Sequence, residues 1–282
     1  MRQLVFIAIA FFLSGCASLE KAALPEPVLL EPNWQVAAPT ATVEIDQTAW
    51  DNFLSRFIKT DTAGINRLDY GSVTANDHSQ LRDYISRLEQ INTKTLSQDQ
   101  QLAYWFNLYN AKTVDLVLEA YPVDSILDIK DGFLPTGPWN RKVVRVNSQE
   151  LSLNDIEHRI VRPVFEDPRI HYALNCAAAG CPNLMPRAWR AETLEADLDA
   201  AERAYVNDPR GIRFDANGRL TLSKIYSWFS EDFGNDEEEV LEDLLYAASP
   251  ELQDKLYGRT SVDRYEYDWS LNDVKNGVFP AN

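Results

Sequence analysis

The 282-residue chain carries 43 acidic and 27 basic residues, which gives a formal net charge of −16 at pH 7. A chain this acidic is not expected to bind nucleic acid or anionic lipid headgroups through a general electrostatic field. Beyond an N-terminal leader and linker it retains roughly 240 residues, enough for one large domain with a sizeable core.

The first predicted element is a secretion signal. Arg2 precedes an unbroken apolar run, Leu4–Leu13, which is too short to span a bilayer but has the length of a signal peptide. The run ends in Leu13-Ser14-Gly15-Cys16, which resembles the lipobox cleaved by lipoprotein signal peptidase. We therefore expect residues 1–15 to be removed and Cys16 to anchor the chain in a lipid bilayer through its acyl groups. An ordinary secretory signal with an incidental cysteine is the alternative.

The residues after Cys16 predict the location and a spacer. Neither Ala17 nor Ser18 is acidic, so nothing argues for inner-membrane retention, and we expect the outer membrane, facing the periplasm. Residues 16–43 combine the lipidated cysteine with a proline-rich, aperiodic linker that would hold the domain off the membrane. The domain itself is expected at residues 44–282.

Three helices are predicted in the first half of the domain. Apolar residues recur at helical spacing from Trp50 to Ile58 and again from Leu81 to Leu88. A capping box at Ser97 opens a third helix that runs to about Ala120. The third helix is mostly apolar, and Asn107 and Asn110 extend its apolar side, which is typical of a central, buried helix.

The middle of the chain predicts two strands and one helix. Lys142–Val146 is expected to be a strand, followed by a turn at Asn147-Ser148. Ser152 with Asp155 resembles a capping box for a helix that ends at Arg162, before Pro163. Apolar and polar residues alternate over Arg169–Asn175, which predicts a strand leading into the loop 176–182.

The last third predicts further helices around short strands. Residues 191–206 have a helical pattern, and Asn217-Gly218 predicts a hairpin between two apolar runs. Ser223 and Asp236 are expected to begin helices, and Tyr265, Tyr267 and Trp269 alternate in a last strand. Together these elements predict an α+β fold, a single mainly helical domain with a few short strands and hairpins after the signal and linker.

Polar residues within the apolar helices are the first candidates for a site. A buried asparagine without partners costs roughly 1–3 kcal/mol, so Asn107 and Asn110 need hydrogen bonds. Either each amide fixes a neighbouring loop, or the two line a polar cleft. Glu157 and His158 point about 100° apart on their helix, so one of them can face inward. His158 is a candidate base, although a lone histidine is more often a satisfied hydrogen-bonding residue.

The two remaining cysteines allow three interpretations. In an oxidising compartment, the simplest interpretation is that Cys176 and Cys181 form a disulfide. Alternatively, Cys176 is a reactive thiol, presented after a strand and activated by a base such as His158; His171 would lie on the other face of that strand. A metal site that includes His171 is the weakest interpretation, because the Cys-x4-Cys spacing is unusual for one.

The order of these landmarks resembles the domain-of-unknown-function family 547. The segments that carry the resemblance are Tyr104-Trp-Phe-Asn-Leu-Tyr-Asn110-Ala, Leu151-Ser-Leu-Asn-Asp-Ile-Glu-His158-Arg-Ile-Val-Arg162-Pro, Asp167-Pro-Arg-Ile-His-Tyr-Ala-Leu-Asn-Cys176-Ala-Ala-Ala-Gly-Cys181-Pro-Asn183, Asn207-Asp-Pro-Arg-Gly211, Leu222-Ser-Lys-Ile-Tyr-Ser-Trp228-Phe and Tyr267-Asp-Trp-Ser-Leu-Asn-Asp273. They span roughly residues 45–275. At Asn147-Ser148 this chain departs from the glycine turn that is common in the family, but Asn147 can adopt the left-handed conformation.

The resemblance carries no established activity, but it narrows the choice of residues. The family pattern implies that Asn107, Asn110, Glu157, His158, Arg162 and Cys176 recur even in eukaryotic relatives, whereas Cys181 does not. Because a disulfide needs both cysteines, this pattern favours a role for Cys176 beyond a disulfide.

Two hypotheses follow. In the first, the protein is a thiol-dependent hydrolase or acyltransferase with Cys176 as nucleophile, His158 as base, and Glu157 or an asparagine as orienting group or oxyanion donor. In the second, it is a non-catalytic binding or structural lipoprotein with a Cys176–Cys181 disulfide. Asn107, Asn110, His158 and Arg162 would then form a ligand cleft or a buried hydrogen-bond network, and His171 is a further candidate binding residue. No cofactor motif is present in the sequence, and the substrate or envelope partner is not specified by any motif.

Overall fold

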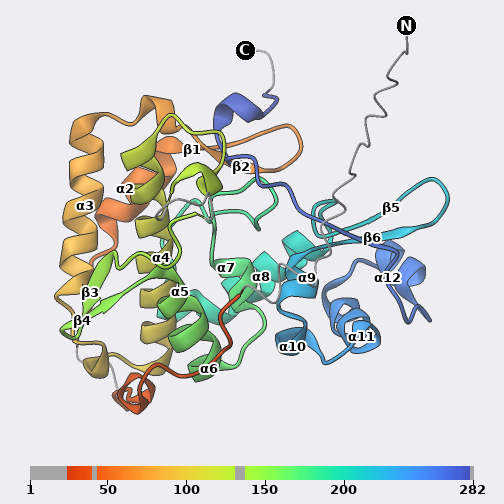
Figure 1. Ribbon diagram of the computed structural model, residues 1–282, viewed down its shortest axis with the longest axis horizontal. Helices are drawn as coiled ribbons and strands as arrows, with labels where there is room; N and C mark the ends of the chain where they lie inside the picture. The colour runs from red at the N-terminus through yellow and green to blue at the C-terminus, as the bar shows by residue number, and fades with distance from the viewer. Residues whose placement is uncertain (1–23, 40–42, 131–136, 280–282) are drawn as a thin grey trace, which may run out of the picture.

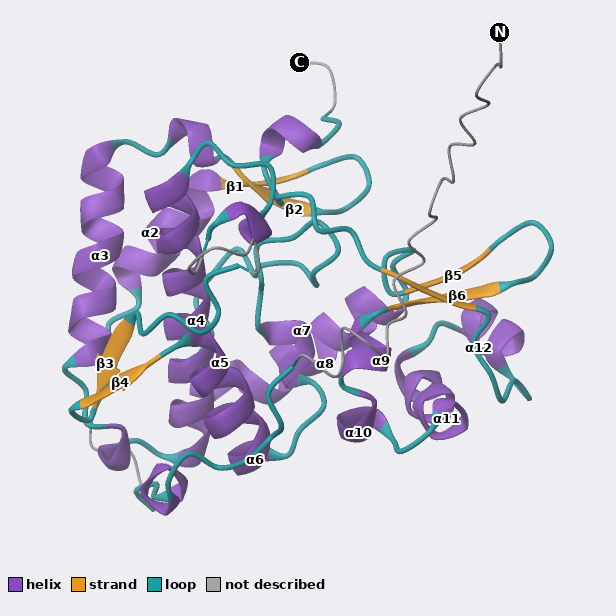
Figure 2. Cartoon of the chain, in the orientation of Figure 1, coloured by secondary structure: helices purple, strands orange, loops and turns teal. Residues whose placement is uncertain are grey.

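The structure is a computed structural model that describes residues 24–39, 43–130 and 137–279. The expected signal peptide and Cys16 lie outside these residues. Figure 2 shows that the described chain contains far more helix than strand and that the strands form small, separate sheets. The predicted α+β class, mainly helical with short hairpins, is confirmed.

Figure 1 shows the elements in chain order, with the long helices α3 and α4 in the first half and mostly short elements after them. The α-helices of the described residues are α2 (Thr48–Phe57), α3 (Ala75–Glu89), α4 (Gln98–Ala120), α5 (Leu153–Ile156), α6 (Arg162–Phe165), α7 (Ile170–Ala173), α8 (Leu194–Val206), α9 (Ile225–Trp228), α10 (Ser230–Phe233), α11 (Glu237–Ala247) and α12 (Pro250–Leu256). The strands are β1 (Ile58–Thr60), β2 (Asn66–Leu68), β3 (Val144–Val146), β4 (Gln149–Leu151), β5 (Ile212–Phe214), β6 (Leu220–Ser223) and β7 (Arg264–Glu266).

The first of two hydrophobic cores is built around α4. Tyr104, Trp105 and Phe106 are consecutive and all buried, so α4 is enclosed on every side, as the sequence predicts. The predicted capping box is present. The backbone N–H of Gln100 donates to Ser97 Oγ, and the backbone N–H of Ser97 donates to Gln100 Oε1, both at 3.3 Å. α3 packs against α4 and α2 packs against α3, which buries the apolar faces of both predicted helices.

The β3–β4 hairpin turns as expected at Asn147-Ser148. Both residues have positive φ angles, 49° and 67°, which is the conformation of a type I′ turn. The Asn147 side chain also donates to Thr93 Oγ1 at 2.7 Å. The glycine that is common at this turn in family 547 is therefore not required here.

The helix that begins at Ser152 continues beyond its predicted end. It runs through α5, a π-helical segment at Glu157–Val161 and α6, which ends at Phe165. The prediction that the helix stops before Pro163 is wrong. Proline has no N–H to donate within a helix, and the wider π turn before Pro163 lets the helix continue without that hydrogen bond. The carbonyl of Arg159, which proline leaves without its helical donor, accepts instead from the backbone N–H of Leu30 at 2.9 Å.

That hydrogen bond belongs to a segment that we expected to be a spacer. Trp34 is 3% exposed and packs edge-on against Trp105, with ring centroids 5.6 Å apart. The Ala38 N–H donates to the Leu96 carbonyl at 2.8 Å. The described part of the linker is thus packed onto the helices and does not hold them at a distance, while the domain boundary at residue 44 stays a prediction.

The predicted strand over Arg169–Asn175 is wrong. Ile170–Ala173 forms the single helical turn α7, and only the residues after it are extended. Asp167 and Pro168 explain the helix: Asp167 Oδ1 accepts from the Arg169 N–H at 2.9 Å, and proline favours a first helical turn. Seven alternating residues are too few to distinguish one helical turn from a strand.

The second core lies between α8–α12 and a three-stranded sheet. β5 and β6 form the hairpin predicted at Asn217-Gly218, and β7 pairs with β6 in parallel after the chain has passed through α9–α12. The last strand is shorter than predicted and ends at Glu266, before Tyr267. Ser223 closes β6, and its Oγ accepts from the Ile225 N–H at 3.3 Å at the start of α9. Asp236 caps α11, as expected.

Across residues 24–39, 43–130 and 137–279, no helix combines the length and apolar character required to cross a bilayer.

Candidate functional site

The two cysteines form a disulfide within residues 175–183, here called the cysteine loop. Their Cα atoms are 6.3 Å apart. The two sulfur-bearing residues differ in accessibility, since Cys176 is partly exposed and Cys181 is 3% exposed. The disulfide interpretation is therefore the one the structure shows, and the sulfur needed by a thiol nucleophile is bonded to Cys181.

Asn110 fixes the start of the cysteine loop. Its Nδ2 donates to the Ala173 carbonyl at 2.9 Å, and its Oδ1 accepts from the Asn175 N–H at 2.8 Å. Asn175 continues the chain of amides, because its Oδ1 accepts from the Ala177 N–H and its Nδ2 donates to the Pro182 carbonyl. One buried helix residue thus sets the backbone that presents Cys176.

The far end of the loop is held by Arg210 and Asn183. Arg210 donates to the carbonyls of Ala179 and Cys181 at 3.2 and 2.8 Å and to Asn183 Oδ1 at 3.1 Å. Asn183 also accepts from the Asn66 N–H at 3.0 Å, which joins the loop to β2.

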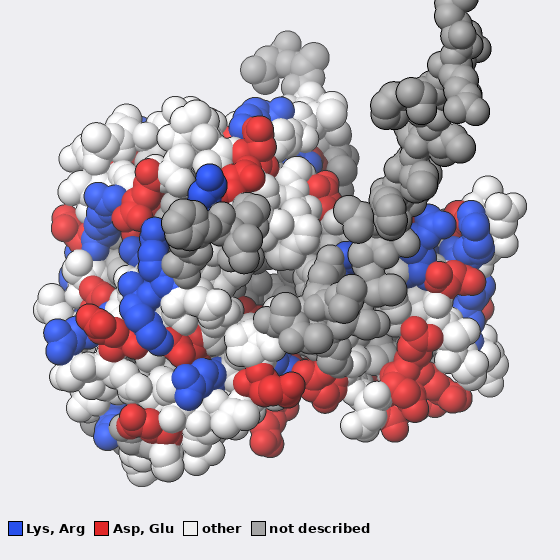
Figure 3. Space-filling view, in the orientation of Figure 1, with Lys and Arg blue, Asp and Glu red and all other residues white. Residues whose placement is uncertain are grey.

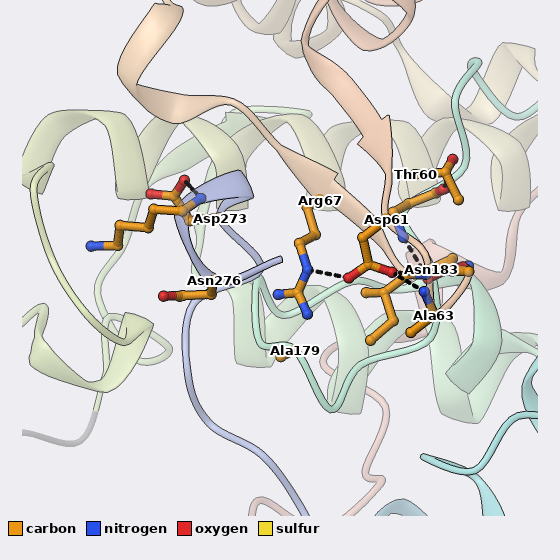
Figure 4. A network of polar contacts seen from close by, with 12 residues as sticks. Thr60, Asp61, Ala63, Arg67, Ala179, Asn183, Asp273 and Asn276 are labelled. Carbon is orange, nitrogen blue, oxygen red and sulfur yellow. Dashed lines mark hydrogen bonds and ion pairs between the residues drawn. The ribbon is translucent and has the colours of Figure 1, made fainter. Parts of the chain in front are cut away.

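Figure 4 shows the β1–β2 turn beside Asn183. There Asp61 accepts from Arg67 Nε at 2.6 Å and from two backbone amides of its own turn, those of Ala63 and Ile65. Both members of this ion pair are buried, so the turn against which the loop rests is itself rigid.

Tyr267 covers the disulfide. Its hydroxyl lies 2.9 Å from Cys176 Sγ and 3.1 Å from Cys181 Sγ. A disulfide sulfur carries no hydrogen, so the hydroxyl is the donor. Burial raises the pKa of Tyr267 well above its usual value, and nearby Tyr205 and Glu157 raise it further. Tyr267 is therefore a neutral donor at all physiological pH values.

Asn107 has the structural role that was one of the two alternatives. Its Nδ2 donates to the Trp189 carbonyl and its Oδ1 accepts from the Trp189 N–H, both at 2.9 Å. Asn107 and Asn110 are at most 2% exposed, and each side-chain amide donates to one backbone carbonyl and accepts from one backbone N–H. The asparagines fix two separate loops and do not line an open cleft.

Arg162 and His171 meet at a residue that the sequence did not single out, Asp232. Arg162 forms a bidentate pair with it, Nε to Oδ2 at 2.6 Å and Nη2 to Oδ1 at 2.9 Å. His171 Nε2 lies 2.6 Å from Asp232 Oδ2, and its ring stacks on Phe229 at 4.2 Å. Burial alone would raise the pKa of Asp232, but the hydrogen bonds from His171 and Arg162 outweigh it and hold that pKa well below its usual range.

His158 lies beside this cluster. It is 2% exposed, and Nη1 of Arg162 donates to its Nδ1 at 3.4 Å. Burial lowers the pKa of His158, and Arg162 and His171 lower it further against the opposing charges of Glu157 and Asp232. His158 is therefore neutral at pH 7.

The predicted pair of Cys176 and His158 is not formed by direct contact. Within the described part of the chain, no hydrogen bond joins a ring nitrogen of His158 to a cysteine sulfur. The Glu157 carboxylate is hydrogen-bonded elsewhere: its Oε2 accepts from the Tyr109 hydroxyl at 2.9 Å. The structure brings together His158, Arg162 and His171 around Asp232, and it brings Cys176 and Cys181 to Tyr267.

Asp232 and Tyr267 escaped the sequence analysis because their partners are far away in the chain. Asp232 is 70 residues from Arg162, and Tyr267 is 91 residues from Cys176. The one available signal was the polar Ser-Glu-Asp stretch between Phe229 and Phe233, which places a carboxylate inside an aromatic segment.

The described residues contain no group of three His, Cys, Asp or Glu side chains that could hold a metal ion.

Figure 3 shows acidic side chains gathered over α10 and α11. Among them, Glu238, Glu239 and Glu242 are exposed.

Two carboxyl groups between α8 and α11 predict a pH effect on stability. Burial raises the pKa of Glu202 to about 6, with Asp243 adding to the shift; burial raises the pKa of Asp243 to about 6 as well, with Asp167 adding to it. A carboxyl pKa raised in the folded state means that ionisation above pH 6 destabilises the fold and protonation below it relieves this cost.

We therefore expect Asp243→Asn to raise the free energy of unfolding at pH 7.5 by about 1–2 kcal/mol, and by less at pH 5, where the carboxyl is already protonated. Urea unfolding at both pH values measures this, with the exposed neighbour Glu242→Gln as control. A variant that is less stable than the unchanged protein at pH 7.5 would contradict the prediction.

The comparisons with known proteins agree with the resemblance seen in the sequence. Residues 93–206 match the family described as "Protein of unknown function, DUF547". No curated protein and no solved structure matches the chain. The matched segment contains the asparagines of α4, the Glu157–Arg162 segment and the cysteine loop, whereas the three resembling segments after residue 206 lie outside it. Over residues 93–206 the chain is therefore similar to the DUF547 family.

Proposed function

We propose that the protein is an envelope lipoprotein, acylated at Cys16 on the periplasmic face of the outer membrane, whose DUF547 domain has a binding or structural role. The observation that supports a binding or structural role is the Cys176–Cys181 disulfide. In it the Cys176 sulfur, which a thiol hydrolase would need as a free nucleophile, is bonded to Cys181. The anchor is supported by the lipobox-like Leu13-Ser14-Gly15-Cys16 after an apolar run.

The polar residues around the loop support this choice. The side-chain amides of Asn107 and Asn110 form hydrogen bonds with backbone groups, and Arg162 and His171 are paired with Asp232. Arg162 is 4% exposed and His171 is 4% exposed, so neither presents a free polar group to a substrate. All four residues are in buried hydrogen bonds: Asn110 positions the cysteine loop, Asn107 holds the backbone of Trp189, and Arg162 and His171 bind Asp232.

Both parts of the proposal are tested on protein extracted from membranes. Intact mass is expected to show loss of residues 1–15 and addition of acyl groups, and Cys16→Ser is expected to leave the chain unacylated and release it from the lipid fraction. Non-reducing peptide mapping should find Cys176 and Cys181 in one peptide lacking two hydrogens. An unacylated membrane form, or a peptide with two thiols, would refute the corresponding part.

A thiol-dependent hydrolase or acyltransferase is the second candidate, favoured by one observation. Cys176 is partly exposed and its sulfur lies 2.9 Å from the Tyr267 hydroxyl, which can donate to a thiolate. This activity requires the reduced protein. It predicts that, after reduction, iodoacetamide alkylates Cys176 faster than free cysteine at pH 7, and an alkylation rate no faster than free cysteine at every pH excludes it.

A further inference from the structure

We propose that the Cys176–Cys181 disulfide is an exchangeable redox centre, in which a thiol attacks Cys176, Cys181 leaves as a thiolate, and Tyr267 tunes the equilibrium. The proposal rests on the disulfide of the proposed function but is independent of the lipid anchor. It assigns to the domain a thiol–disulfide exchange activity and to Tyr267 a role at the reacting atoms.

The asymmetry of the two sulfurs gives the reaction its direction. Cys176 is partly exposed, whereas Cys181 is 3% exposed. Exchange proceeds by attack of a thiolate on one disulfide sulfur, so access decides which sulfur is attacked. Residue 176 is the more exposed of the two, so the proposal assigns the attack to Cys176 and makes the buried Cys181 the leaving group.

The leaving sulfur is supplied with hydrogen-bond donors. The Cys176 N–H lies 2.9 Å from Cys181 Sγ, and the Tyr267 hydroxyl lies 3.1 Å from the same atom. Donors of this kind favour the charged form of the group that accepts them, here the Cys181 thiolate. Because Tyr267 is a neutral donor, it stabilises either thiolate and does not repel it.

The step balances with a thiol as the only co-reactant. An external thiolate bonds to Cys176 Sγ, the Cys176–Cys181 bond breaks, and its electron pair stays on Cys181 as a thiolate. A second external thiolate then attacks the sulfur of the first, releasing an external disulfide and the Cys176 thiolate. The protein disulfide is reduced by two electrons and the two external thiols are oxidised; the reverse sequence closes the loop again.

The loop keeps its shape without the disulfide. Asn110 and Asn175 hold its start, and Arg210 holds the carbonyls of Ala179 and Cys181. A disulfide that closes so short a loop restricts the unfolded chain less than one that closes a long loop. Breaking the bond therefore leaves both sulfurs in place, so the disulfide can close again.

The first experiment equilibrates the purified full-length protein in glutathione buffers of different reduced-to-oxidised ratios and measures the reduced fraction by alkylation and intact mass. We expect reversible reduction within this range. Because a hydrogen bond to a charged group contributes more than a neutral one, Tyr267→Phe should shift the equilibrium roughly tenfold toward the disulfide. It should also move the pH profile of Cys176 alkylation in the reduced protein to higher pH.

Tyr265→Phe is the matched control, because its hydroxyl lies 3.0 Å from Glu237 and not near the sulfurs. In a second experiment, Cys181→Ser treated with oxidised glutathione should form a mixed disulfide at Cys176, and Cys176→Ser should form none at Cys181. A closed disulfide that resists reduced glutathione, equal equilibria for the two tyrosine variants, or adduct at Cys181 alone would overturn the inference. Two free thiols in the native protein would instead refute the proposed function itself.

Discussion

Replacing Arg162 with methionine is expected to lower the free energy of unfolding by about 3 kcal/mol. Removing one member of a buried ion pair leaves the other charge without compensation, which is far more costly than losing an exposed pair. Arg162 is 4% exposed, and it donates two hydrogen bonds to Asp232 and one to Glu231. Asp232 keeps His171 in the variant, which limits the loss.

The stabilisation by the Arg162–Asp232 pair should decrease as the pH falls. Because His171 and Arg162 hold the pKa of Asp232 below its ordinary value of 3.8, the stabilisation is present above that pH and is lost as pH falls below it. Arg159→Met is the control, since Arg159 lies in the same helix but its side chain is 40% exposed and pairs with Asp155 at 3.4 Å. Urea unfolding at pH 7 should therefore separate the variants. Equal stability of Arg162→Met and Arg159→Met would show that the pair with Asp232 does not join the two cores.

Replacing Asn110 with alanine is expected to cost about 2–4 kcal/mol. The variant leaves the Ala173 carbonyl and the Asn175 N–H buried without their partners, and each such group carries a desolvation penalty of about 1–3 kcal/mol. The same change should free the start of the cysteine loop, so hydrogen exchange at the Asn175 amide should accelerate.

Asn154→Ala provides the comparison, because the Asn154 amide binds the Asn140 side chain at the surface. We expect it to change stability by less than about 0.5 kcal/mol. Thermal unfolding and hydrogen exchange by mass spectrometry read out both effects. If Asn110→Ala leaves exchange at Asn175 unchanged, Asn110 does not position the loop.

The parts of the fold that were predictable from sequence are those with strong local signals. α4 is 23 residues long, carries a capping box at Ser97 and is apolar on most of its surface, so its place at the centre of a core follows from the sequence. The β5–β6 hairpin and the cap of α11 were predicted from Asn217-Gly218 and Asp236 for the same reason.

The errors occurred where local signals conflict. The alternation in Arg169–Asn175 is apparent only, because Asp167 and Pro168 start a helical turn there. Pro163 normally ends a helix, but the π-helical segment before it relieves the conflict, and the N–H of Leu30 replaces the missing donor. That replacement depends on a segment more than a hundred residues away in sequence.

The candidate site was predictable in its residue types but not in its pairs. From the sequence, Asn107 and Asn110 were expected to need hydrogen-bond partners, Arg162 and His171 were candidate binding residues, and a Cys176–Cys181 disulfide was one of the alternatives. Their partners are backbone groups of distant loops and Asp232, which no spacing rule identifies. Only the three-dimensional structure shows that Cys176 lies against Tyr267 and not in contact with His158.

The most direct test of this account is the number of free thiols in the protein as it exists in the envelope. Intact cells are treated with a membrane-permeant alkylating reagent before lysis, the protein is purified under denaturing conditions, reduced, alkylated with a second reagent and mapped. We expect Cys176 and Cys181 both to carry the second reagent, because the disulfide protects them from the first. First-reagent label on both cysteines would contradict the disulfide-held loop and would make a free Cys176 thiol the centre of the site.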